Sequence, residues 1–294
     1  MKLMWKVILV FMSVLALVFF FTGDFFLSAP ASTENTANKL ETLAKLDKEV
    51  EESSGIEQIP GTNNKYLTHN DAGNKPRLYQ INEQGEVEQT YKPDLPNVDW
   101  EDLTQDNSGN FYIADTGNNS NKRRELAIYK LKLGNLEQAQ AIRFSYEDQD
   151  EFPPSKKDRN FDSEAIFWHN NKLYLISKDR GRSETAKVYQ LPDQPGKYQA
   201  KLIGSIKVKA QITGAAISSN AETIALLSDE KLHIINGFNS VENFYEGELQ
   251  NISLKEAGQT EGVTFINDNT LMLTSEGGNL YRYSLQTASS ATHQ

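Results

Sequence analysis

Acidic side chains recur along the chain at places where they could bind a cation. Glu101, Glu164 and Glu261 each open a short apolar stretch, and Asp71 and Asp115 close another. Carboxylate oxygens are the ligands that Ca²⁺ and Mg²⁺ prefer in proteins. We therefore expect Asp71, Asp115, Glu101 and Glu164 to ligate a divalent metal ion, with Ca²⁺ as the expected cofactor.

Amide side chains stand in the same segments. The basic residues Lys178 and Arg180 follow Glu164 by 14 and 16 residues. Basic groups among carboxylates could bind a small anionic ligand, directly or through a metal ion. A carbohydrate is the other small ligand that we consider. The alternative is that these residues only form turns and surface ion pairs. The candidate ligand-binding residues are Asn70, Asp71, Asn118, Asn119, Lys178, Arg180, Glu261 and Glu276.

Most familiar catalytic arrangements are missing. The chain has no cysteine and four histidines, and it has no Gly-x-Ser-x-Gly elbow, P-loop or His-Glu-x-x-His motif. The remaining possibility is a metal-bound water activated by a carboxylate base. Glu164 and Glu101 are the candidate catalytic residues for that chemistry.

A repeated unit positions these residues. Its copies start 47 to 63 residues apart, which suits the blades of a β-propeller. Each copy has two apolar runs around a turn rich in Asn, Asp or Gly, and then a third alternating run, as expected for strands joined by hairpins. The copies open with Ser54-Gly55-Ile56, Glu101-Asp102-Leu103, Glu164-Ala165-Ile166, Gly214-Ala215-Ala216 and Glu261-Gly262-Val263.

The repeat predicts an all-β protein with five four-stranded blades. A fourth run completes most units, but the last unit lacks one, so we expect the segment Thr42 to Glu51 to close the ring. Six blades, one of them degenerate, and a β-sandwich are the alternatives. In a propeller, the start of each first strand meets the end of the second at one end of the channel, which would gather the candidate residues into one acidic pocket.

The N-terminal segment differs in composition from the repeated units. Lys2 and Lys6 precede an unbroken apolar run, Val7 to Phe21, which predicts an export signal. If it is retained, residues 3–21 form a hydrophobic helix that anchors the protein in the inner membrane. We divide the chain into a signal peptide or anchor (1–31), a linker (32–41), the propeller (42–288) and a tail (289–294).

Composition limits the partners. Lys and Arg number 30 against 40 Asp and Glu, and the net charge of −10 disfavours nucleic acid. The absence of cysteine in an exported protein indicates a bacterial source. We expect a monomer in the periplasm or at the cell surface.

Seven motifs recur at the ends of the expected strands. They are Ser54-Gly55-Ile56, His69-Asn70-Asp71-Ala72-Gly73-Asn74, Asp99-Trp100-Glu101-Asp102, Ala114-Asp115-Thr116-Gly117-Asn118-Asn119, Phe161-Asp162-Ser163-Glu164-Ala165, Thr213-Gly214-Ala215 and Glu261-Gly262. Together they resemble the phytase-like and SdiA-regulated-type bacterial propellers, over roughly Leu43 to Leu285. The resemblance implies an exported or membrane-anchored propeller with an axial, calcium-dependent site, and it implies phosphoesterase activity in the better-known relatives.

Three functions follow as expectations. The first is an extracytoplasmic ligand-binding propeller with an acidic, cation-dependent site at one end of its channel. The second is a metal-dependent phosphoesterase. The third is a protein-binding scaffold of the cell envelope.

Overall fold

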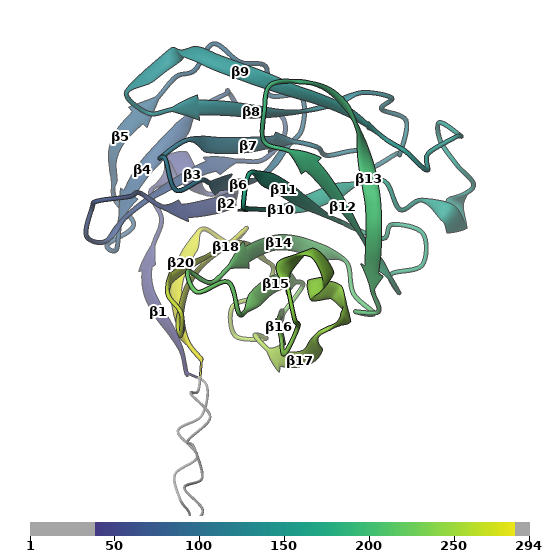
Figure 1. Ribbon diagram of the computed structural model, residues 1–294. Coiled ribbons are helices and arrows are strands. Elements are labelled where there is room, and N and C mark those ends of the chain that lie inside the picture. The colour runs from purple at the N-terminus through teal and green to yellow at the C-terminus, as the bar shows by residue number, and fades with distance from the viewer. Residues whose placement is uncertain (1–38, 286–294) are drawn as a thin grey trace, which may run out of the picture. The chain divides into compact units, whose positions relative to one another are not determined.

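The computed structural model describes residues 39–285, and the fold there is a five-bladed β-propeller (Figure 1). The expected signal peptide or anchor (1–31) and its hydrophobic helix lie outside the described residues, as do most of the linker and the tail (289–294). Among the described residues, no helix has the length and apolar character needed to cross a membrane.

Five four-stranded units, which we call blades 1 to 5, follow one another along the chain. Blade 1 consists of β2 (Ser53–Gln58), β3 (Lys65–Asn70), β4 (Leu78–Asn82) and β5 (Val87–Tyr91). Blade 2 consists of β6 (Trp100–Gln105), β7 (Phe111–Asp115), β8 (Leu126–Lys132) and β9 (Asn135–Tyr146). Blade 3 consists of β10 (Ser163–His169), β11 (Lys172–Ser177), β12 (Ala186–Pro192) and β13 (Gly196–Ile206). Blade 4 consists of β14 (Ile212–Ile217), β15 (Ile224–Ser228), β16 (Lys231–Asn236) and β17 (Glu248–Ser253).

Blade 5 joins the two ends of the described chain. It consists of β18 (Thr260–Asn267), β19 (Thr270–Ser275), β20 (Asn279–Ser284) and the N-terminal strand β1 (Lys39–Lys45). β1 pairs antiparallel with β20, which confirms that an N-terminal strand closes the ring.

The bounds of the closing strand differ from the expected segment, residues 42–51. β1 ends at Lys45, and the 3₁₀ turn η1 (Lys48–Val50) leads from it to blade 1. The charged sequence after Leu46 bends away because Asp47 accepts a hydrogen bond from the backbone N–H of Val87 (2.8 Å). The propeller therefore begins at residue 39, inside the segment that we had expected to be linker.

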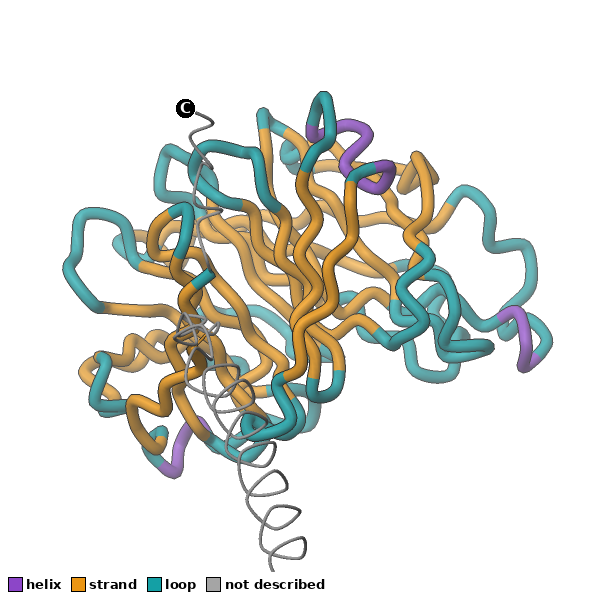
Figure 2. Tube along the Cα trace, turned by 90° about the horizontal axis from the view of Figure 1, so that it is seen from below, coloured by secondary structure: helices purple, strands orange, loops and turns teal. Residues whose placement is uncertain are grey.

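The first strands of the blades surround the channel. β2, β6, β10, β14 and β18 contact one another in that order, and β18 contacts β2 again. Figure 1 shows these strands around the centre, and Figure 2 shows that the short helical turns, including η2 (Lys156–Asp158) and η3 (Val241–Glu246), are peripheral. This closed cycle of five excludes a sandwich and a sixth blade.

Each blade buries both of its faces against its neighbours. Five apolar clusters occur, one at each junction between blades. In β10, Ile166 packs toward blade 2, whereas the next residue, Phe167, packs toward blade 4. Since successive side chains of a strand point to opposite faces, inner strands must be apolar at nearly every position. This requirement explains the short apolar runs of the repeat.

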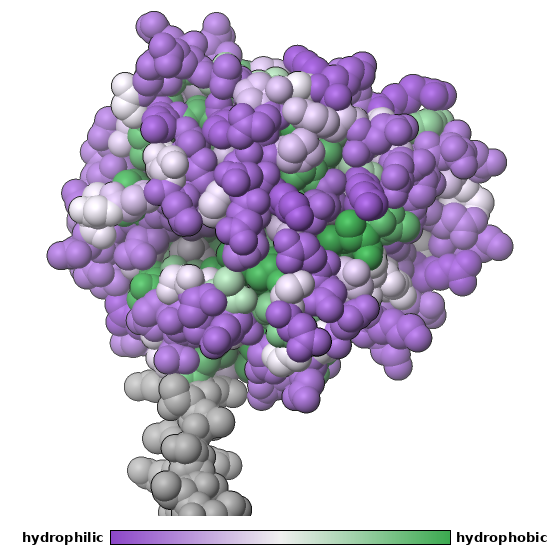
Figure 3. Space-filling model, viewed as in Figure 1, coloured by the Kyte–Doolittle hydropathy of each residue, from purple (hydrophilic) through white to green (hydrophobic). Residues whose placement is uncertain are grey.

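One junction carries an additional link. The outer strands of blades 2 and 3, β9 and β13, are long and pair in parallel, which joins the two blades into one eight-stranded sheet. The repeat did not predict this pairing. On the outside, hydrophilic side chains cover most of the face shown in Figure 3, with apolar groups visible near its centre.

Candidate functional site

A β-bulge stands at the start of the first strand of every blade. The pairing register with the second strand shifts there in all five blades. A bulge adds a residue and re-aims its side chain. The residues at the shifts are Ser54, Glu101, Glu164, Thr213 and, in blade 5, Glu261 with Gly262. The repeat therefore places one special position per blade at the same end of the channel.

A pocket of about 420 Å³ lies at this end, which we call the acidic mouth. Backbone hydrogen bonds fix its outer wall in four blades, because an N–H shortly after the second strand donates to the carbonyl two residues before the bulge in blades 1, 2, 3 and 5. Lys178, for example, donates to Asp162 in this way. The pocket is lined by Glu52, Ser53, Ser54, Asp71, Ala72, Glu101, Asn119, Glu164, Lys178, Arg180, Gln259, Glu261 and Glu276.

The acidic mouth has six carboxyl groups but only two basic groups in its lining. Burial raises the pKa of Glu261 to about 7. Burial also holds the pKa of Glu101 well above its usual range, and the neighbouring Glu164 and Asp71 add to that shift. The pKa of Glu276 is raised as well, first by burial and then by Asp71. The pocket thus concentrates more negative charge than its own cations neutralise.

Lys178 and Arg180 are both paired within the protein. Lys178 Nζ donates to one oxygen of Glu164, and Arg180 donates to the other. Arg180 Nε also contacts Asp162 at 2.6 Å, and the guanidinium donates to Asn119. These bonds join blades 2 and 3 across the mouth and leave both cations neutralised by carboxylates.

Asp71, Asp99 and Glu101 form a group that could hold a metal ion. One oxygen from each lies within 4.8 Å of the others. A Ca²⁺ ion with ligands at roughly 2.3–2.6 Å accepts oxygens at such separations. None of the three carboxylates forms an ion pair within residues 39–285. Burial, followed by the charges of Asp71 and Asp162, raises the pKa of Asp99 to about 6. The donor set and its uncompensated charge therefore fit a hard divalent cation.

A second group, Glu101, Asp162 and Glu164, meets the same spacing. Arg180 already forms ion pairs with Asp162 and Glu164, so the protein's own guanidinium neutralises this group. The better candidate for a metal ion is the first group.

Gly117 allows the two acids of blade 2 to pack closely. A Cβ at this position would lie 2.1 Å from Glu101 Oε1 and 2.4 Å from Asp99 Oδ2. A side chain there would force both carboxylates to move. The glycine in the Asp-Thr-Gly-Asn-Asn segment thus permits the close approach of these carboxylates.

Three expected site residues are not among those lining the pocket. Asp115 is buried, and its carboxylate binds Arg123 (2.9 Å) and the N–H of Asp99 (3.1 Å), so it positions the loop that carries Asp99. Asn118 donates to the carbonyl of Phe161 (2.9 Å), and Asn70 donates to that of Glu49 (2.7 Å). The structure gives all three a structural position behind the mouth. By contrast, it brings together Asp71, Glu101, Asn119, Glu164, Lys178, Arg180, Glu261 and Glu276.

Sequence reasoning counted Asp99 and Asp162 as further carboxylates at the starts of strands but did not include them among the candidate site residues. Both stand two residues before a bulge position, and the same offset gives Glu52 and Gln259, which line the pocket. Alignment of the five copies on the bulge residue, rather than on the apolar run, would have revealed this second polar position.

No protein-family model matches the chain, and no curated sequence matches it either. Among solved structures, the chain is similar to an inactive variant of virginiamycin B lyase from Staphylococcus aureus with quinupristin (TM-score 0.43, 13% identity, 80% of this chain and 66% of the lyase). It is similar to a protein of unknown function from Bacteroides thetaiotaomicron (TM-score 0.49, 11% identity, 84% and 76% of the two chains). A third is the PQQ-bound aldose sugar dehydrogenase from Streptomyces coelicolor (TM-score 0.46, 9% identity, 84% and 98%).

These similar structures are β-propeller-like proteins of diverse function. At such identities a shared fold carries no activity with it. The function of this chain must therefore be argued from the acidic mouth itself.

Proposed function

We propose that the protein is an exported ligand-binding propeller whose acidic mouth holds Ca²⁺ between Asp71, Asp99 and Glu101. The observation that carries the proposal is the convergence of three carboxylates, from two blades, without a basic partner. Burying several like charges is costly unless a cation neutralises them. Export is supported by Lys2, Lys6 and the apolar run after them.

An anionic ligand would bind through the ion. Lys178 and Arg180 are engaged with Glu164 and Asp162, so direct contact with an anion would require them to leave these partners. A bound divalent cation instead offers free coordination positions toward the pocket, because it takes six to eight oxygen ligands. The resemblance of the motifs to phytase-like and SdiA-regulated-type propellers supports a phosphate-bearing ligand of this kind.

Binding fits the geometry better than hydrolysis. A general base needs an unpaired oxygen, but both oxygens of Glu164 accept bonds from cations. Glu101 is the remaining candidate base, and a calcium ion would supply a polarised water or phosphate oxygen. A phosphoesterase therefore stays the second proposal, and its base would be Glu101.

Calorimetric titration of the purified protein with CaCl₂ tests the metal site. We expect one strong site in the native protein, with affinity about tenfold or more weaker in Asp99→Asn and Glu101→Gln. Asp229→Asn is the matched control, because Asp229 directly follows the second strand of blade 4 and is exposed. Absence of calcium binding, or equal binding in all four proteins, would refute the metal site.

Inorganic phosphate and p-nitrophenyl phosphate then separate the functions. A binding protein should bind phosphate only when calcium is present and should release no nitrophenol. Calcium-dependent release of nitrophenol would establish the phosphoesterase instead. Calcium binding with no phosphate binding would favour the protein-binding scaffold.

A further inference from the structure

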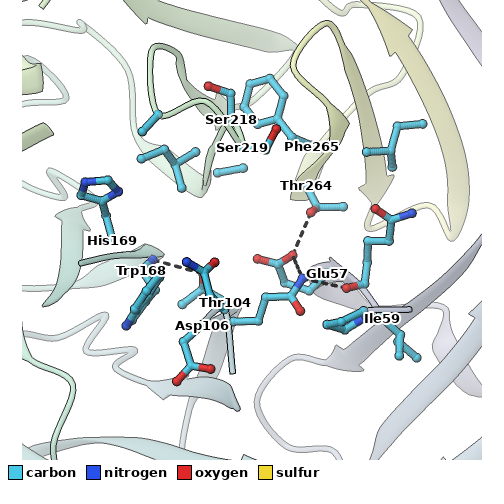
Figure 4. Close-up of a pocket in the computed structure, with 18 of the residues that line it drawn as sticks. Glu57, Ile59, Thr104, Asp106, Trp168, His169, Ser218, Ser219, Thr264 and Phe265 are labelled. Atoms are coloured by element: carbon cyan, nitrogen blue, oxygen red, sulfur yellow. Dashed lines mark hydrogen bonds between the residues drawn. The ribbon is translucent and has the colours of Figure 1, made fainter. Parts of the chain in front are cut away.

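A second cavity opens at the opposite end of the channel. It has a volume of about 610 Å³, within the range of small-molecule sites, roughly 300–1,000 Å³. All five blades contribute to it, through the ends of their first strands and the turns that follow. Figure 4 shows its lining, with Trp168 and His169 together on the left, Phe265 at the top and Glu57 near the centre of the view. We call this cavity the turn-side pocket.

Glu57 places a carboxyl group in the turn-side pocket. Its Oε2 accepts hydrogen bonds from Gln105 Nε2 (3.0 Å) and Thr264 Oγ1 (2.9 Å), which fix the group in place. Both bonds are made to one oxygen, and the carboxyl group faces the open centre of the pocket (Figure 4). The side chain is thus anchored, with its carboxyl group turned toward a ligand in the pocket.

The lining of the turn-side pocket contains no lysine or arginine. Its other acid, Asp106, is saturated by bonds from the backbone of Ser108 and Asn110 and from the hydroxyl of Tyr112. Glu57, in contrast, forms no ion pair within the described part of the chain. The pocket therefore has one carboxyl group to which no positive charge has been supplied.

Gln105 provides an independent sign of a missing donor. Its Nε2 donates to Glu57 and to the carbonyl of Gln58 (2.7 Å), so the orientation of its amide is determined by two acceptors. Its Oε1 is buried and has no hydrogen-bond partner within residues 39–285. A buried acceptor without a donor is costly, and such groups occur at functional sites.

We propose that the turn-side pocket binds a small organic ammonium ion, with a primary ammonium group donating to Glu57. The pocket presents the Glu57 carboxyl group, and its lining has no lysine or arginine, so a cation with N–H groups complements it. Trp168 and Phe265 supply aromatic surface that favours the same charge. This site is independent of the acidic mouth and of the function proposed for it.

Ammonium binding should release protons. Burial raises the pKa of Glu57 to about 7, and hydrogen bonds from Thr264 and Gln105 act against that rise. The other titratable groups near it are Asp102, buried in the channel wall, Asp106 and His169, whose pKa burial lowers. A bound cation favours the ionised carboxylate, so part of a proton passes from Glu57 to the buffer when the ligand binds near neutral pH.

Titration of the native protein with n-butylammonium chloride, with n-butanol and glucose as neutral probes, tests the proposal. We expect binding of the amine alone, and affinity about tenfold or more weaker in Glu57→Gln. The matched control is Glu248→Gln, which makes the same change on the exposed outer strand β17 and should leave binding unchanged. Equal binding of butanol or glucose, or full binding by Glu57→Gln, would overturn the proposal.

A second measurement needs no variant. The binding enthalpy of the amine, measured in two buffers of different ionisation enthalpy, reports the protons released. Release near neutral pH that vanishes at about pH 9, where Glu57 is already ionised, supports the assignment. An enthalpy independent of the buffer, or no binding at all, would contradict it.

Discussion

Replacement of Glu57 by glutamine should raise the free energy of unfolding at about pH 8, where the native side chain is ionised. At about pH 4, where Glu57 is protonated in the folded protein, ionisation of this group should contribute little to the difference. Burial raises the pKa of Glu57 from 4.5 to about 7 in the folded protein. The folded state therefore retains a proton that the unfolded chain has already lost. The stability linked to this group is fully present below pH 4.5 and is lost as the pH rises to about 7.

The magnitude follows from the shift. A pKa raised from 4.5 to about 7, at about 1.4 kcal/mol for each pH unit, corresponds to roughly 3.5 kcal/mol of lost stability above neutral pH. Glu57 keeps part of its surface in contact with the cavity, where water screens the charge, so we expect nearer to 2 kcal/mol. Glutamine can still accept the bonds from Thr264 and Gln105, which keeps the substitution close to isosteric.

Urea unfolding from about pH 4 to about pH 8 measures this effect. The free energy of unfolding of Glu57→Gln minus that of the native protein should rise by about 2 kcal/mol across this range. Glu248→Gln, on the exposed outer strand β17, is the control and should show a flat difference. A flat difference for Glu57→Gln as well would refute the reasoning about its burial.

The remaining predictions concern the acidic mouth and the closure of the ring. Gly117→Ala should weaken calcium binding in calorimetry, because the new Cβ would displace two carboxylates. Gly134→Ala is the control, since a Cβ there meets nothing within 4 Å, and equal calcium affinities of the two variants would contradict the close-approach argument. Arg180→Met should lower the free energy of unfolding in urea by about 3 kcal/mol, since it removes a partner of buried Glu164, and a loss under about 1 kcal/mol would show that the pair contributes little. Deletion of Lys39–Lys45 exposes the edge of β20 and should lower Tm by about 10 °C relative to a chain that starts at residue 39; an unchanged Tm would show that β1 is dispensable.

The sequence was sufficient to predict the five-bladed ring. Inner strands such as β11 and β15 are buried on both faces, so their apolar runs and the turns between them recur at a fixed spacing. The same repetition marked Glu101, Glu164 and Glu261 as equivalent positions. Because symmetry of the ring places equivalent positions at one end, their gathering followed from the fold alone.

Other features depend on register and on neighbouring blades, which spacing does not reveal. Asp115 ends the apolar strand β7, and Asp99 stands just before β6, but only the bulge at Glu101 decides that Asp99 lies beside Glu101 and Asp115 behind it. The parallel pairing of β9 with β13 depends on two outer strands that extend beyond their own blades. Glu57 follows the buried positions of β2, and its place at a second pocket became evident only from the structure.

The most direct test of the calcium site uses Trp100, which lies in the sequence between Asp99 and Glu101 and is fully buried. Terbium(III) replaces Ca²⁺ in oxygen sites and luminesces when a nearby tryptophan is excited. We predict tryptophan-sensitised terbium luminescence that Ca²⁺ displaces and that Glu101→Gln abolishes. Luminescence that persists in Glu101→Gln, or that Ca²⁺ fails to displace, would contradict a metal site at the acidic mouth.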